Sequence, residues 1–150
     1  MIRQGIQTNF KDLNMRRWAC YWFTLVAWSQ FVSKREWTDD ELIEKFYEHK
    51  SKNWVCKEPN SFLTRHAVAI FNDMAGVPDY FINVEHTNGN KDFPKTLRFP
   101  VFYERTAPDG FDHFALVEID RNGNVRIVFD SWAISAASRG MIIKNFRRFR

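Results

Sequence analysis

A stretch with two apolar runs around Asn122-Gly123 constrains the fold of this chain more than any other feature. Residues 112–132 alternate little between polar and apolar side chains and are rich in Val, Ile, Leu and Phe on both sides of the pair. An Asn-Gly pair between two such runs is the strongest short-range signal for a β-hairpin, because both residues accept the positive φ of a type I′ turn. The runs are apolar on both faces near their middles, which favours central, covered strands.

A two-residue turn at Asn122-Gly123 also fixes which residues of the hairpin face each other. In this register His113 and Asp130 lie on the same face as diagonal neighbours, about 7–8 Å apart at the backbone, within reach of an imidazole–carboxylate contact. A slip of one residue would place them on opposite faces. The predicted pairs are Arg121–Asn124, Val117–Val128, Ala115–Asp130 and His113–Trp132.

A nearly uncharged apolar segment far upstream is the second strong feature. Residues 18–32 carry no charge and are apolar almost all round, which predicts a buried helix. A polar, basic lead-in precedes it, so Cys20 is expected in the first turn. A helix N-terminus lowers the pKa of a thiol, and a neighbouring imidazolium lowers it further. Cys20 is therefore a candidate nucleophile for the His113–Asp130 pair.

The order of the elements predicts an α+β fold in a single domain, residues 1–150. Residues 1–17 are expected to form an irregular polar arm, and Thr38 to Glu41 match a capping box that opens a helix to about Lys50. A further helix is expected over 61–75 and a strand over 80–84. A short last strand at 141–143 would precede a basic tail, Phe146 to Arg150.

Composition excludes several classes of protein. The 45% hydrophobic and 17% aromatic content is typical of a globular chain, and the net charge of +4 is too mild to predict a nucleic-acid surface. Two cysteines give neither a disulfide framework nor a metal-binding spacing, so no metal or cofactor is expected. The apolar helix is shorter than the ~20 residues of a membrane span, and no signal segment is recognisable. A cytoplasmic location is the expectation.

A cysteine that opens a buried helix, a histidine that begins a later strand and an acid on the next strand resemble the papain-like cysteine peptidases. More narrowly, the chain resembles the C39-like peptidase group, in Gln7, in 19–25 (Ala-Cys-Tyr-Trp-Phe-Thr-Leu), in 112–117 and in 129–132 (Phe-Asp-Ser-Trp). The resemblance implies a papain-like fold and cleavage of a peptide or amide bond through an acyl-enzyme. It also implies that Cys20 is the nucleophile, His113 the general base and then acid, and Asp130 the group that fixes the imidazole.

The resemblance further implies a glutamine ahead of the cysteine as an oxyanion donor. Asn14 stands six residues before Cys20, where the group usually has that glutamine, and Gln7 lies farther back. A longer insertion between donor and nucleophile favours Gln7, and Asn14 is its rival. The residue before the nucleophile, commonly Gly in this group, is Ala19.

The other candidate residues have structural interpretations. Cys56 has no comparable surroundings, His49 is expected on a helix surface, His66 on an amphipathic helix and His86 before a turn. Two functions remain open: a thiol hydrolase acting on an unidentified peptide or protein substrate, and a catalytically inactive papain-like scaffold. The second would be a small binding or effector protein whose basic C-terminal tail engages an acidic partner.

Overall fold

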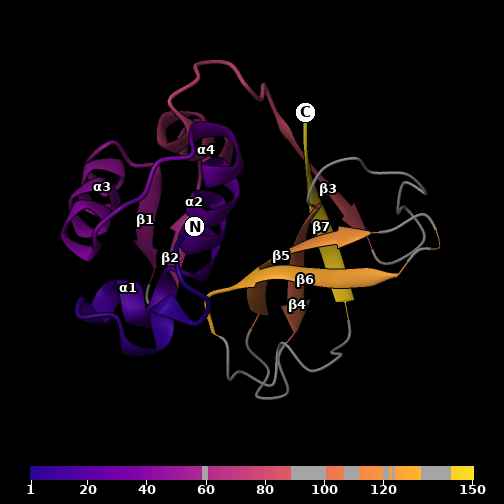
Figure 1. Cartoon of the computed structure of the whole chain (residues 1–150), viewed down its shortest axis with the longest axis horizontal. Coiled ribbons are helices and arrows are strands. Elements are labelled where there is room, and N and C mark those ends of the chain that lie inside the picture. Colours follow the sequence, from indigo (N-terminus) through magenta and orange to yellow (C-terminus); the bar gives the residue numbers. More distant parts are fainter. Residues whose placement is uncertain (59–60, 89–100, 107–111, 120–121, 123, 133–142) are drawn as a thin grey trace.

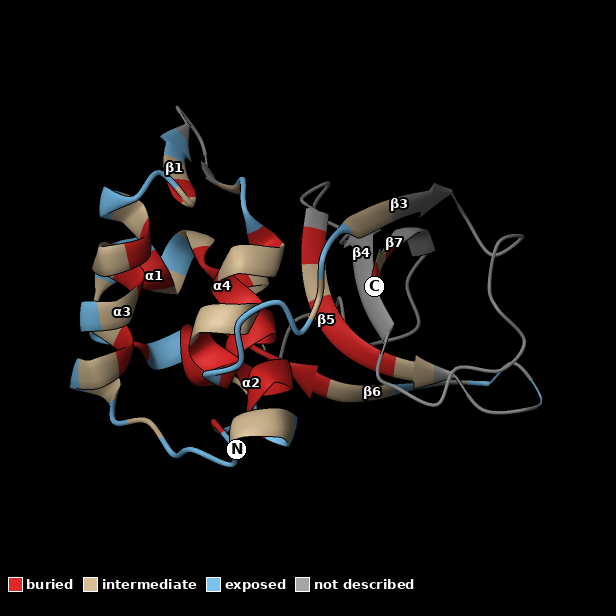
Figure 2. Cartoon of the chain, turned by 90° about the horizontal axis from the view of Figure 1, so that it is seen from above, coloured by how far each residue is buried: buried red, intermediate tan, exposed pale blue. Residues whose placement is uncertain are grey.

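The computed structural model places the helices at one end of the molecule and a five-stranded sheet at the other, with α2 between them (Figures 1 and 2). It describes residues 1–58, 61–88, 101–106, 112–119, 122, 124–132 and 143–150. The mixed α+β class predicted from the sequence is confirmed.

The helical end contains a short 3₁₀ helix, four α-helices and a two-stranded antiparallel sheet. The helices are η1 (Ile6–Asn9), α1 (Leu13–Trp18), α2 (Cys20–Ser33), α3 (Asp39–Ser51) and α4 (Ala67–Ala75). The small sheet pairs β1 (Val55–Glu58) with β2 (Ser61–Thr64). The large antiparallel sheet has the order β3 (Val84–Asn88), β7 (Ile143–Phe149), β4 (Val101–Thr106), β5 (Asp112–Ile119), β6 (Val125–Asp130).

Helix α2 forms the centre of the core, as its uncharged sequence predicts. Every residue from Trp22 to Gln30 is buried, because α4 packs on one side of the helix and β5 on another. Trp28 illustrates the arrangement: its ring lies 5.0 Å from that of Phe71 on α4 and 4.9 Å from that of Phe149 on β7. The helix is thus held between the two ends of the molecule, with Cys20 as its first residue.

The capping box predicted before α3 is confirmed. The Thr38 hydroxyl accepts from the Glu41 backbone N–H at 3.2 Å, and the Glu41 carboxylate accepts from the Thr38 N–H at 2.9 Å. Two of the N–H groups that a helix start leaves without partners are satisfied in this way. The two bonds explain why α3 begins at this position.

The hairpin of β5 and β6 forms with the predicted pairing at one end and a different pairing at the other. Ala115 pairs with Asp130 as predicted, but Val117 pairs with Ile127 instead of Val128. The register shifts between Leu116 and Val117, where a β-bulge takes up one residue of β6. The predicted Val117–Val128 pair is therefore wrong, and the Arg121–Asn124 pair lies outside the described residues.

The hairpin lies at the end of the large sheet, so the prediction that it forms the central pair is wrong. Strand β6 is an edge strand, but residues 4–7 run along its outer side. The Gly5 N–H donates to the Asp130 carbonyl at 2.9 Å, and the Gln7 N–H donates to the Ser131 carbonyl at 3.0 Å. These bonds cover part of the edge that an outer strand leaves open.

Four other predictions are corrected. Residues 1–17 contain η1 and α1 instead of an irregular arm, and the expected helix over 61–75 is divided into β2 and α4. The expected strand over 80–84 begins only at Val84. The basic segment 146–150 is largely part of β7, between β3 and β4, and Arg147 and Phe149 are buried. Pairing on both sides of β7 explains the last correction.

No helix in the described part of the chain is both long enough and apolar enough to cross a lipid bilayer.

Candidate active site

Cys20 occupies the start of α2, where the helix meets the sheet. Its side chain is half-buried and does not form a disulfide bond. The buried hydroxyl of Thr24, one turn later, donates to the Cys20 carbonyl at 2.7 Å and lies 3.4 Å from the carbonyl of Phe114. Because Phe114 follows His113 on β5, these contacts place the first turn of α2 beside the strand that carries the histidine.

His113 and Asp130 form a buried pair, on the shared face that the hairpin register predicts. The His113 Nε2 lies 2.6 Å from the Asp130 Oδ1, and each residue is only 2% exposed. The same Oδ1 accepts from the Trp132 backbone N–H at 2.8 Å. The Trp132 ring stacks on the imidazole at 5.2 Å with an interplanar angle of 23°, so an aromatic ring covers the pair.

The protonation of His113 depends on two side chains. Burial by itself lowers the pKa of His113, but hydrogen bonds to Asp130 and to Cys20, with the negative charges of both groups, raise it to about 9. Because Asp130 engages Nε2, Nδ1 is the ring nitrogen that remains for the thiol. The arrangement favours a protonated imidazole at neutral pH.

Gln7 is fully buried beside this pair. The nitrogen of its side-chain amide has no hydrogen-bond partner among the described residues. Its Oε1 accepts from the Ser131 hydroxyl at 2.7 Å, while its Nε2 has no hydrogen-bond partner among the described residues. A buried donor without a partner costs about 1–3 kcal/mol. The Ser131 contact fixes the amide so that the donor nitrogen, and not the oxygen, is left over.

Asn14, the rival of Gln7, lies elsewhere. Its side chain is exposed, and its amide donates to the Tyr47 hydroxyl on α3 at 3.3 Å. Cys56 is on β1, where its sulfur contacts the Asn53 carbonyl at 3.5 Å. The structure therefore brings Gln7, Cys20, His113 and Asp130 to one region and leaves Asn14 out of it.

Two residues at this site were not identified from the sequence. Gln4 donates to the Val128 carbonyl at 2.7 Å and accepts from the Asp130 N–H at 2.8 Å, so its amide holds the end of β6. Ser131 orients Gln7. The position of Ser131 next to Asp130 was a usable signal, whereas nothing near Gln4 in the sequence indicates its contact with a strand more than a hundred residues away.

The prediction that His49 lies on a helix surface is wrong. His49 is fully buried, and its Nε2 lies 2.7 Å from the Asp73 Oδ2, which makes a second histidine–aspartate pair. His66 is exposed at the N-cap of α4, and His86 lies within β3; the turn expected after it falls outside the described residues. Within the described part of the chain, no group of three or more His, Cys, Asp or Glu is arranged to hold a metal ion.

No protein-family model matches this chain, and no curated protein or solved structure matches it either.

Proposed function

We propose that the chain is a thiol hydrolase that cleaves a peptide or amide bond through an acyl-enzyme, with a papain-like arrangement of the C39-like kind. The main support is the buried His113–Asp130 pair at 2.6 Å, together with Cys20 as one of the groups that raise the pKa of the imidazole. A nucleophile, a base and a group that orients the base are the minimum for this chemistry.

In the proposed reaction the Cys20 thiolate attacks the carbonyl carbon of the scissile bond. The His113 imidazolium then gives its proton to the leaving nitrogen, which departs as an amine and leaves a thioester on Cys20. Neutral His113 next takes a proton from water, whose oxygen attacks the thioester. Collapse of that second intermediate breaks the carbon–sulfur bond and releases the acid product and the Cys20 thiolate, so the thiolate–imidazolium pair is restored. Asp130 stabilises the imidazolium and keeps its ring oriented throughout.

We assign the oxyanion donors to the Gln7 Nε2 and the Cys20 backbone N–H. The Gln7 nitrogen is buried and unpartnered among the described residues, as a donor reserved for a developing charge would be. Cys20 is the first residue of α2, where backbone N–H groups lack partners within the helix. The exposed Asn14, bonded to Tyr47, has no comparable position.

The proposed reaction requires a reduced Cys20 thiol and therefore a reducing compartment. We propose that this compartment is the cytoplasm. The substrate would be a peptide or protein. The inactive-scaffold alternative included a basic tail free to engage an acidic partner. Most of that segment is part of β7, with Arg147 and Phe149 buried, Arg148 half-buried and Arg150 exposed. The two buried residues weigh against a tail that is free along its whole length.

The test is the pH dependence of alkylation at Cys20. The rate of iodoacetamide modification would be followed by mass spectrometry in a Cys56→Ser background, so that only one thiol reacts. We expect rapid modification well below the pH of an unperturbed thiol, near 8.5. His113→Ala should move this profile up to that value. A peptidyl vinyl sulfone should label the wild-type thiol and should not label His113→Ala at the same rate.

The control compares the wild-type chain with Cys56→Ser alone. The two proteins should show the same pH dependence of modification at Cys20. If Cys20 stays inert across neutral pH in the folded protein, the hydrolase proposal fails and the scaffold alternative is favoured. If Cys20 is activated but no peptide or amide substrate turns over, the thiol chemistry stands and the assigned reaction does not.

A further inference from the structure

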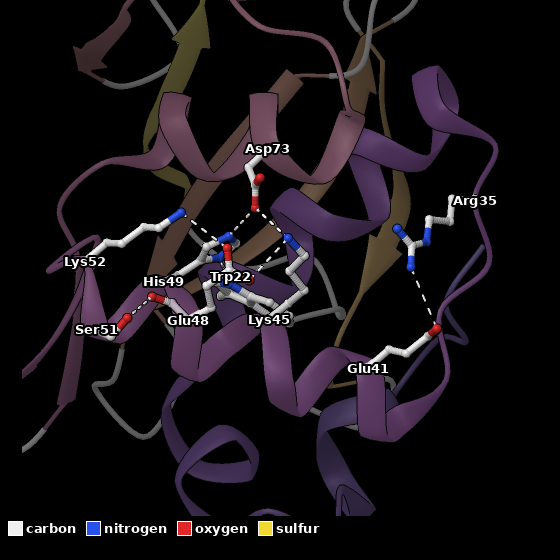
Figure 3. Close-up of polar contacts among 9 residues, drawn as sticks. All are labelled: Trp22, Arg35, Glu41, Lys45, Glu48, His49, Ser51, Lys52 and Asp73. Atoms are coloured by element: carbon white, nitrogen blue, oxygen red, sulfur yellow. Dashed lines mark hydrogen bonds and ion pairs between the residues drawn. The ribbon is translucent and has the colours of Figure 1, made fainter.

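The second histidine–aspartate pair lies where three helices meet. Figure 3 shows His49 of α3 between Trp22 of α2 and Asp73 of α4. The Trp22 indole Nε1 donates to the His49 Nδ1 at 3.0 Å, and the His49 Nε2 lies 2.7 Å from the Asp73 Oδ2. His49 is 0% and Trp22 1% exposed. One imidazole therefore joins three helices inside the core.

These two contacts determine the tautomer of His49. An indole nitrogen is a donor only, so Nδ1 must act as an acceptor and carries no proton. Nε2 then carries the proton and donates to the Asp73 carboxylate. A protonated imidazole has donors at both nitrogens and no acceptor. Protonation of His49 would bring an Nδ1–H group face to face with the Trp22 indole N–H, with the two nitrogens 3.0 Å apart. The buried indole N–H would then have no acceptor on the imidazole and no water molecule to replace it.

Charges on every packed element bear on this histidine. Asp73 of α4 favours a charged ring, but the Lys45 Nζ of α3 shares the same Oδ2 at 3.2 Å. Lys45 also pairs with Glu48 at 3.3 Å, Glu48 pairs with Lys52 at the end of α3, and the Trp54 ring lies 5.3 Å from the imidazole (Figure 3 shows all but Trp54). Trp22 is the contact from α2. The carboxylate beside His49 is thus already partly neutralised.

The balance of these effects disfavours the charged form. Burial lowers the pKa of His49 below its ordinary value of 6.5 and Lys45 lowers it further, against the opposing effects of Asp73 and Glu48. As the pH falls below 6.5, the unfolded chain takes up this proton and the folded chain resists it. Acid therefore acts against the arrangement that joins the three helices.

We propose that His49 is an acid-sensitive lock: its neutral imidazole joins α2 to α3 and α4, and its protonation releases the Trp22 indole and loosens the start of α2. Trp22 is two residues beyond Cys20, so the release reaches the turn that carries the thiol. The lock does not depend on any chemistry at Cys20.

The direct test is an NMR titration of the intact chain from pH 7.5 to 4.5. It follows the imidazole ¹H–¹³C signal of His49 and the exchange of the Trp22 indole proton with solvent, assigned with His49→Gln and Trp22→Phe. We expect His49 to titrate below 6.5 and indole exchange to accelerate at least tenfold as it does. Trp22→Phe removes the opposing donor, so the pKa of His49 should rise toward 6.5.

A second measurement is the urea midpoint as a function of pH. His49→Gln keeps an N–H donor for Asp73 and cannot titrate, so the acid loss of stability between pH 6.5 and the His49 titration should disappear. His66→Gln is the matched control, since His66 is exposed and makes no side-chain cap bond; its acid loss should equal that of the wild type. The proposal is overturned if His49 titrates at or above 6.5, if Trp22→Phe leaves its pKa unchanged, or if the indole stays protected after His49 is protonated. The titration of the wild type decides the matter even where a variant fails to fold.

Discussion

Replacing Asp130 with Asn should separate the charge of the acid from its geometry. Asn keeps an oxygen that accepts from the His113 Nε2, now 2.6 Å from the Asp130 Oδ1, and it keeps an acceptor for the Trp132 N–H. The negative charge is lost, and an amide NH2 takes the place of the buried Oδ2, which has no hydrogen-bond partner among the described residues. Any change in the chemistry of Cys20 must then be carried by the protonation of His113.

The magnitude follows from the pKa of His113, about 9 against an ordinary 6.5, although burial opposes the rise. This difference corresponds to roughly 3 kcal/mol in favour of the imidazolium. The bond to Asp130 is the first of the effects that raise it, and an opposite charge at such a distance typically shifts a pKa by roughly 1–3. Asp130→Asn should therefore lower the pKa of His113 by about that amount. The ring would then lose its proton at a lower pH than in the wild type.

The assay is the alkylation rate of Cys20 against pH in the Cys56→Ser background. With a neutral His113, the acidic limb of the profile should move upward by about one pH unit or more in Asp130→Asn, and His113→Ala should move it to about 8.5. If His113→Ala moves the limb and Asp130→Asn does not, the charge of Asp130 has no part in holding the imidazolium. An acidic limb that neither variant moves would refute the thiolate–imidazolium pair itself.

Three other predictions concern the same site. Ser131→Ala removes the donor that orients Gln7, so kcat should fall by about 10–10³ while the alkylation profile of Cys20 stays in place; a shifted profile would contradict a role confined to the oxyanion. Gln4→Ala removes two bonds to the end of β6, and a lower pKa of His113 in an NMR titration would show that Gln4 positions Asp130, whereas an unchanged pKa would limit Gln4 to stability. The raised pKa of His113 contributes stability that is fully present below pH 6.5 and lost as the pH rises toward about 9, so the urea midpoint of the wild type should fall over this interval and that of His113→Ala should not.

Local pattern sufficed to predict the elements that carry the candidate nucleophile and base. The uncharged run 18–32 could only be a buried helix, and α2 begins at Cys20. The hairpin register correctly places Ala115 opposite Asp130, so His113 and Asp130 share a face. Both inferences depend on residues close together in the sequence, where side-chain period alone decides which face a residue occupies.

The features that sequence reasoning missed depend on contacts between distant segments. The bulge at Leu116 and Val117 shifts one end of the hairpin, and no turn residue marks it. Residues 4–7 lie along β6 only because the fold brings the chain start to that edge. His49 follows a helical pattern that assigns it to the surface, yet α2 and α4 supply a donor and an acceptor that make its burial tolerable.

The two histidine–aspartate pairs show that such a pair does not by itself define a catalytic site. Both imidazoles are buried, and each Nε2 lies at nearly the same distance from a carboxylate, 2.6 Å for His113 and 2.7 Å for His49. Their pKa values nevertheless move in opposite directions, up for His113 and down for His49. Burial lowers the pKa of both imidazoles, but at His113 the effects of Asp130 and Cys20 outweigh it. At His49 Lys45 competes for Asp73, and the Trp22 N–H leaves no acceptor for a second ring proton. A base suited to thiol chemistry is therefore identified by what faces its second nitrogen.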